Sequence, residues 1–599
     1  MTTRGTAKLT TWIGAMAVVF GTTMAAVSCS KCGENAEAQD AASAVLPPVP
    51  APEGLLADIY VPAPNVVWQK VQRGIGGPVG ILPSSAGGIV SMGLGLDPLV
   101  ANEIDGAAPL FAVLAGDPSA PSWAIAFRLA DARKARSVLA DGEMARFSSR
   151  EREGMTELVP KEGTTPPQAA IAITKSSYLV LGKSAADLER LVPYVTRTLT
   201  ARPLPSTGAV IADVPRAAIA TTIKPKLDGL WAAAKAYLLS ADERMRAERG
   251  GRAPDFGDPK AIVEALDGYA TKRLAVVGDL ERMRIALDVT DDGIALQATM
   301  TPSGPTGPAA TWTNAMKTGD LGPATDHAAS SALVVATRDS EEDRAEQAQE
   351  LEKALTKALG SRIGEADGKR LHDTIGEWTK ARGEATTAAL VWDEPQGLVL
   401  RTQARDVDAS KSAMKGAVDL SRVSPFKEML RVKDVTLSTD DVGGPEKASL
   451  AVFLREPPKV DPKDAKRRPP PPAPAAGDGG APAPPKSEPK KDELSLAWVV
   501  QSGALSVATG SHALSTLRSS VKPEKKLSDD PAIARPLRAL GSDASLLVLA
   551  QPLRFDPSRA NLPTAPLVMA LGRREKDAFV RLDVANGLLR ELARWQLGL

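Results

Sequence analysis

The 599-residue chain is poor in the residues on which several classes of site depend. It has two cysteines, Cys29 and Cys32, and three histidines, so a closed zinc site with four ligands lacks donors. Aromatic residues make up 4% of the chain, which argues against stacking platforms for carbohydrate or single-stranded nucleic acid. Neither charge prevails, since 73 basic residues stand against 72 acidic ones. We therefore expect no metal, no cofactor and no nucleic-acid partner.

The first 28 residues have the order of a secretory signal. Arg4 and Lys8 precede an apolar stretch from Trp12 to Val27, and small residues follow. A membrane span usually needs about 20 apolar residues, and this stretch falls short of that length. The sequence therefore predicts residues 1–28 as a signal peptide that is removed on export.

The segment Ala26-Val27-Ser28-Cys29 resembles the lipobox of bacterial lipoproteins. The resemblance implies that Cys29 is lipidated and holds the mature chain on a membrane. The expected location is the outer membrane, on either its periplasmic or its surface face. Ala26 and Ser28 also satisfy the rule for ordinary signal cleavage, so a secreted or soluble periplasmic protein is the alternative. Cys32 completes a Cys-x-x-Cys spacing, but the sequence offers no second ligand pair to make a metal or redox site with it.

Two low-complexity segments interrupt the rest of the chain. Residues 29–53 are rich in Ala and Pro and are predicted to form a disordered tether. Residues 456–493 contain a run of four prolines and charges of both signs, and are also predicted to be disordered. Strand-like runs flank this second segment at 448–454 and 494–500, so we interpret it as an insertion within a domain.

The order of predicted elements in residues 54–323 recurs in residues 324–599. A strand at 55–61 corresponds to one at 331–336, and a hairpin at 110–127 corresponds to one at 389–400. A helix follows each hairpin, with Asp131 and Asp408 expected to cap the two helices. Single strands at 209–212 and 545–549 precede closing hairpins at 284–300 and 567–582, the first of them turning at Asp292-Gly293.

These patterns predict an α+β fold of two tandem similar units, each an antiparallel sheet with helices packed on one face. Unit 1 covers residues 54–323, and unit 2 covers residues 324–599 with its Pro-rich insertion. Two long helical patterns, at 215–249 and 259–280, are expected to cover the sheet.

Catalytic motifs are incomplete in this sequence. Lys317-Thr-Gly319 and Ser412-x-x-Lys415 imitate motifs of penicillin-interacting serine enzymes, but they occur in the wrong order. His372-Asp373 could orient an imidazole, yet its predicted helix offers no paired nucleophile, and a surface histidine is the expected reading. We assign no catalytic residue.

The leading hypothesis from the sequence is a lipid-anchored envelope protein that is not an enzyme and that binds or scaffolds, with a hydrophobic ligand as one version. A hydrolase that works through carboxylates is the alternative from another class. A third hypothesis is an export or folding accessory whose Pro-rich insertion recruits a protein partner.

Overall fold

The computed structural model describes residues 46–597, except 77–79, 143–144, 165–166, 206–207, 249–258, 322–325, 393–395, 457–492 and 557–561. The predicted signal peptide, Cys29 with most of the tether, and nearly all of the Pro-rich insertion lie outside the described residues.

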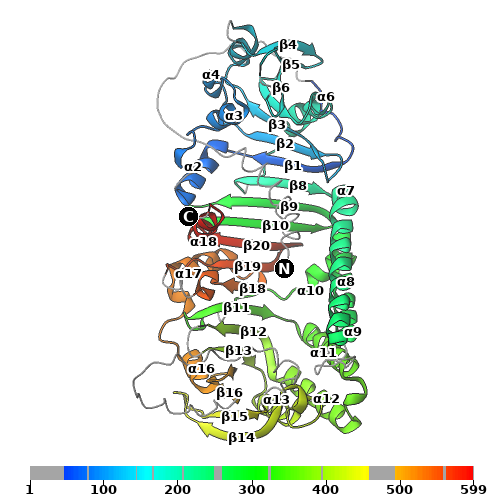
Figure 1. Cartoon of the computed structure of the whole chain (residues 1–599), viewed down its shortest axis with the longest axis vertical. Coiled ribbons are helices and arrows are strands. Elements are labelled where there is room, and N and C mark those ends of the chain that lie inside the picture. Colours follow the sequence, from blue (N-terminus) through cyan, green and yellow to red (C-terminus); the bar gives the residue numbers. More distant parts are fainter. Residues whose placement is uncertain are drawn as a thin grey trace, which may run out of the picture.

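The described strands form one antiparallel sheet of 20 strands, stacked along the long axis of the molecule (Figure 1). The strands of the first half are β1 (Leu55–Val61), β2 (Leu110–Ala115), β3 (Ser122–Arg128), β4 (Phe147–Arg152), β5 (Met155–Pro160), β6 (Ala170–Thr174), β7 (Tyr178–Gly182), β8 (Val210–Pro215), β9 (Leu280–Val289) and β10 (Gly293–Pro302). Those of the second half are β11 (Ser331–Arg338), β12 (Arg382–Val391), β13 (Gly397–Ala404), β14 (Val432–Asp440), β15 (Ala448–Arg455), β16 (Glu493–Gln501), β17 (Ala504–Gly510), β18 (Ala544–Ala550), β19 (Leu567–Arg574) and β20 (Asp577–Ala585).

The expectation of two tandem units is wrong, because β10 and β20 pair along eight residues and join all the strands in one sheet. From one end to β10 the order is β4-β5-β6-β7-β3-β2-β1-β8-β9-β10. From the other end to β20 it is β14-β15-β16-β17-β13-β12-β11-β18-β19-β20. The last strand of each half would otherwise be an open edge, and each edge satisfies the backbone groups of the other.

Helices pack on both faces of this sheet, so the prediction of helices on one face is also wrong. Along β1, Tyr60 packs against the helix α6 (Ala185–Pro193) and its continuation Tyr194–Leu199, whereas Ile59 packs against α2 (Pro64–Ile75). Successive residues of a strand point to opposite faces. We call the two sides of the sheet the α6 face and the α2 face.

Helices also cover both faces in the second half of the chain. In the second half, α16 (Ala513–Val521) and α17 (Pro531–Leu540) cover the α6 face, and α13 (Val407–Leu420) covers the α2 face. The other helices of this fold are α3 (Ala86–Leu94), α4 (Pro98–Ala101), α5 (Ala132–Arg136), α7 (Arg216–Ala218), α8 (Lys224–Glu248), α9 (Pro259–Gly278), α10 (Pro308–Ala315), α11 (Glu341–Leu359), α12 (Glu365–Ala381), α14 (Phe426–Met429) and α18 (Asn586–Leu597).

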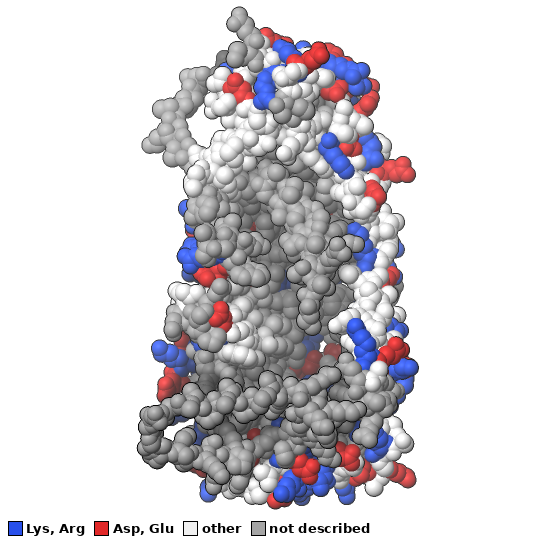
Figure 2. Space-filling view, viewed as in Figure 1, with Lys and Arg blue, Asp and Glu red and all other residues white. Residues whose placement is uncertain are grey.

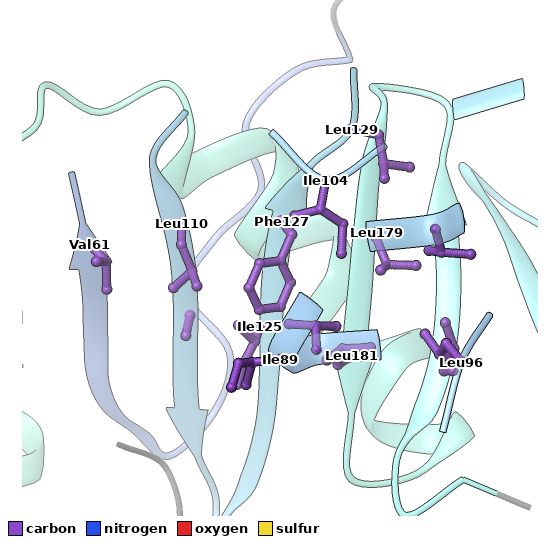
Figure 3. Close-up of a cluster of buried hydrophobic side chains, with 14 of the residues drawn as sticks. Val61, Ile89, Leu96, Ile104, Leu110, Ile125, Phe127, Leu129, Leu179 and Leu181 are labelled. Carbon is purple, nitrogen blue, oxygen red and sulfur yellow. The ribbon is translucent and has the colours of Figure 1, made fainter. Parts of the chain in front are cut away.

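The largest buried cluster lies on the α2 face of the first half. Leu110, Ile125, Phe127 and Leu181 come from three neighbouring strands and pack near Ile89 of α3 (Figure 3). At the opposite end of the sheet, the α2 face is buried by α13 through Met414 and Val418. Both ends of the α2 face are therefore buried in hydrophobic cores, and the middle of this face lies between the two cores.

Local signals in the sequence account for several element boundaries. The Asp131 carboxylate accepts hydrogen bonds from the backbone of Arg133 and Lys134, which confirms it as the cap of α5. In α13 the cap is Asp406 rather than Asp408, which lies in the first turn. The predicted turn at Asp292-Gly293 connects β9 and β10 as a hairpin.

The two long helices do not cover the sheet as expected. Figure 1 shows α8 and α9 running along one edge of the sheet, past the ends of the central strands. We call this pair of helices the arm. Trp231 Nε1 and Lys235 Nζ of α8 donate to the Asp267 carboxylate of α9 at 2.7 and 2.6 Å, which fixes the two helices against each other. Ion pairs of α9 with α11, Lys272–Glu346 and Lys357–Glu264, attach the arm to the second half.

Candidate ligand-binding surface

The predicted lipidation site, Cys29, lies outside the described residues, as does Cys32. No helix within the described ranges is both long and apolar enough to cross a membrane. The same part of the chain contains no group of three or more His, Cys, Asp or Glu residues that could hold a metal ion.

The residues of the incomplete catalytic motifs lie in ion pairs or at the surface. Lys317 forms an ion pair with Glu384 at 3.2 Å, and Ser412 is exposed on α13. Hydrogen bonds from Arg338 and from Lys317 lower the pKa of the Glu384 carboxyl. His372 is exposed on α12 and its Nδ1 lies 2.9 Å from Glu352, while Asp373 pairs with Lys369.

A polar cluster that the sequence did not reveal lies on the α6 face where β1 pairs with β8. Asp58 is 5% exposed, and its Oδ2 accepts hydrogen bonds from Tyr194 Oη at 3.0 Å and Arg202 Nη1 at 2.8 Å. Burial raises the pKa of the Asp58 carboxyl. Asp213 is its partner across the strands, and Arg284 binds both carboxylate oxygens of Asp213 at 2.7 and 2.8 Å.

Both carboxylates of this cluster are thus held by guanidinium groups. Asp58 lies beneath the helical turn that contains Tyr194, and Asp213 has both oxygens bound. The arrangement fixes the helix after α6 to the sheet and holds β8 to β9. We interpret it as a structural network, although it brings together the two facing acids that the hydrolase hypothesis requires.

A buried histidine occupies the α6 face of the second half. His327 is 1% exposed, and its Nε2 lies 2.8 Å from the hydroxyl of Thr387 on β12. Burial, assisted by the nearby charge of Arg401, lowers the pKa of His327 to about 4. The imidazole is therefore neutral at physiological pH and acts as a hydrogen-bonding core residue.

The middle of the α2 face carries an unbroken set of apolar side chains, two from each of eight neighbouring strands. We call this set the apolar face. Its members are Ile285 and Leu287 (β9), Leu296 and Ala298 (β10), Val580 and Leu582 (β20), Met569 and Leu571 (β19), Leu546 and Val548 (β18), Leu333 and Val335 (β11), Ala388 and Leu390 (β12), and Leu398 and Leu400 (β13).

All sixteen of these side chains are partly exposed, and the highest values are 39% for Leu296 and 45% for Leu398. Strands of a sheet lie about 4.8 Å apart, so eight strands span about 34 Å along the axis of the sheet. The alternation is clearest along β18, where Leu547 and Leu549 are buried on the α6 face and Leu546 and Val548 are partly exposed on the α2 face. Exposed apolar surface of this extent is typical of surfaces that contact a ligand, a protein or a membrane.

The arm extends this apolar surface. Ile223, Leu227, Leu230, Ala234 and Tyr237 follow one another at intervals of four and three residues, which places them on one side of a helix. The first member, Ile223, packs against a cluster that includes Met283 and Met300, at the α2 face of β9 and β10. Leu230 and Tyr237 are 65% and 66% exposed, so the stripe continues beyond the contact with the sheet.

A second stripe, on α9, converges on the same cluster. Val276 is buried there, and Tyr269 and Leu266 precede it on the same side of the helix with 60% and 44% exposure. The N-terminal end of α8 and the C-terminal end of α9 thus contact the α2 face, and each helix carries exposed apolar residues away from that contact on the same side of the helix. On the face shown in Figure 2, charged side chains are visible at the two ends of the molecule and along both of its long sides, one of which is formed by α8 and α9.

In comparisons with known proteins, no family model, no curated sequence and no solved structure matches this chain.

Proposed function

We propose that this protein is a lipid-anchored envelope protein that is not an enzyme and that binds an elongated apolar ligand. The apolar face of the central strands carries the proposal, because it is uncharged, partly exposed and continuous across eight strands. Ligand pockets are lined mainly by apolar side chains, and the apolar stripes of α8 and α9 supply further lining beside the sheet. A molecule with a long alkyl chain suits a surface about 34 Å long.

Fluorescence of N-phenyl-1-naphthylamine, a neutral apolar dye, tests this proposal on the full chain purified without detergent. Leu296→Glu puts a charge on the apolar face, and Gln297→Glu puts the same charge on the α6 face of the same strand. We expect the wild type to bind the dye, Leu296→Glu to bind about tenfold more weakly, and Gln297→Glu to match the wild type. Wild-type protein that neither binds the dye nor releases a co-purified apolar molecule in native mass spectrometry would refute the proposal.

The anchor is a separate part of the proposal and has its own test. Bacteria that express the chain are grown with a radioactive fatty acid, and we expect label on the wild type and none on Cys29→Ala. The anchor is wrong if the wild type takes up no label, or if Cys29→Ala takes up as much.

A further inference from the structure

Arg273 is an arginine of the arm that forms no ion pair among the described residues, although its charge, together with that of Lys272, helps to lower the pKa of the nearby Glu346 carboxyl. Its guanidinium carbon lies 4.8 Å from the ring centroid of Tyr269 and 5.5 Å from that of Trp312. Within the described ranges it forms no ion pair and no hydrogen bond, and its side chain is exposed. Its immediate neighbour Lys272, in contrast, pairs with Glu346 at 2.8 Å.

The two rings place this guanidinium beside the apolar face. Trp312 of α10 packs against the cluster that contains Met283 and Met300, which continue the apolar rows of β9 and β10. Tyr269 belongs to the exposed stripe of α9. Stacking on aromatic rings orients a guanidinium while its N–H donors stay available, and these donors match the oxygens of a carboxylate or a phosphate.

We infer that Arg273 binds the anionic head group of an acyl amphiphile whose chain lies on the apolar face. The inference rests on the proposed function and adds to it the chemical class of the ligand, an acyl chain that ends in a carboxylate or a phosphate. Arg273 is the only contact assigned to the head group, and the sixteen uncharged side chains receive the chain.

Competition for the bound dye tests this inference with probes that share one chain. The competitors are oleate, 1-oleoyl lysophosphatidate and neutral oleyl alcohol, and the measurement is how strongly each displaces the dye from the full chain. Arg273→Gln removes the charge at the proposed head-group site. Arg244→Gln is the matched control, because Arg244 also lies over a tyrosine of the arm, 5.9 Å from the Tyr237 ring centroid.

We expect Arg273→Gln to weaken the anionic probes about tenfold and to leave oleyl alcohol unchanged, while Arg244→Gln changes neither. If Arg273→Gln weakens the binding of oleate alone, the natural head group is a carboxylate. If it weakens the binding of lysophosphatidate alone, the natural head group is a phosphate. Equal effects of Arg273→Gln on anionic and neutral probes, or a larger effect of Arg244→Gln, would overturn the inference and leave the proposed function intact. Failure of every probe to bind would overturn both.

Discussion

The two faces of the central strands differ in chemistry although they share one backbone. On the α6 face, β9 and β20 carry Arg284 and Arg581, which are held by Asp213 and Asp583 at 2.7 to 2.8 Å. On the α2 face the same strands carry Ile285, Leu287, Val580 and Leu582, which are apolar and partly exposed. An antiparallel sheet with one solvated face usually keeps its apolar side for the core. On β9 and β20 the polar side therefore stabilises the structure, and the apolar side is the surface that we propose for a ligand.

The largest stability difference between the faces is expected on β18. Leu547 is 1% exposed in the core of the α6 face, and Leu546 is partly exposed on the α2 face. Leu547→Ala should lower the free energy of unfolding by about 3 kcal/mol through lost contacts and a cavity, and Leu546→Ala by about 1 kcal/mol. Denaturant unfolding measures both. Equal losses would mean that the α2 face is a core like the α6 face.

Acidification should destabilise the α6 face through His327. Its pKa is about 4 in the folded protein and about 6.5 when unfolded, so the unfolded chain binds the proton first as pH falls. The contribution of neutral His327 to the free energy of unfolding is fully present above pH 6.5, and it falls by up to about 3 kcal/mol toward pH 4. His327→Gln can keep a hydrogen bond to Thr387 and should lose this component. Unfolding curves at pH 7 and pH 4.5 compare the two proteins, and parallel losses would contradict the assignment.

The polar cluster at Asp58 should show a smaller effect. Tyr194→Phe removes one of the two donors to Asp58 Oδ2 and should cost about 1 kcal/mol of unfolding free energy. Because burial raises the pKa of Asp58, the contribution of this group falls as pH rises above its unfolded pKa of about 4, and the variant should steepen that fall. Tyr178→Phe is the control, since Tyr178 contacts Arg128 and Phe111 through its ring. Equal changes in the two variants would remove the special role of Tyr194.

Local elements of this fold could be predicted because their signals are local. Period-two apolar runs identified the strands that became β1, β8 and β18, and the Asp-Gly pair identified the hairpin of β9 and β10. The strand-like runs beside the Pro-rich segment became β15 and β16, which pair with each other. Asp406 was overlooked because Asp408, two residues later, has the same capping chemistry.

The global arrangement could not be predicted in this way. The sequence of β10 gives no signal that this strand pairs with β20. Both strands end their halves of the chain with the same alternating pattern, and such a pattern does not specify a partner strand. The apolar face was hidden for the same reason, because an apolar position in a strand predicts burial whether or not a helix covers it. The Asp58 cluster joins residues 136 and 144 positions apart, and no spacing rule reports such contacts.

Leu296→Gln, on the apolar face, is expected to have the smallest effect on the free energy of unfolding and a large effect on ligand binding. Leu296 is 39% exposed, so Leu296→Gln should change the free energy of unfolding without ligand by less than about 0.5 kcal/mol. An apolar ligand that binds the folded state raises the melting temperature, and this rise should shrink in Leu296→Gln because its affinity is lower. Thermal unfolding with and without oleyl alcohol measures both effects.

Leu547→Gln, on the buried face, is the control and should lower the melting temperature both with and without oleyl alcohol. A loss near 2 kcal/mol for Leu296→Gln without ligand would show that this side chain stabilises a core, and the contrast between the two faces would then be structural alone.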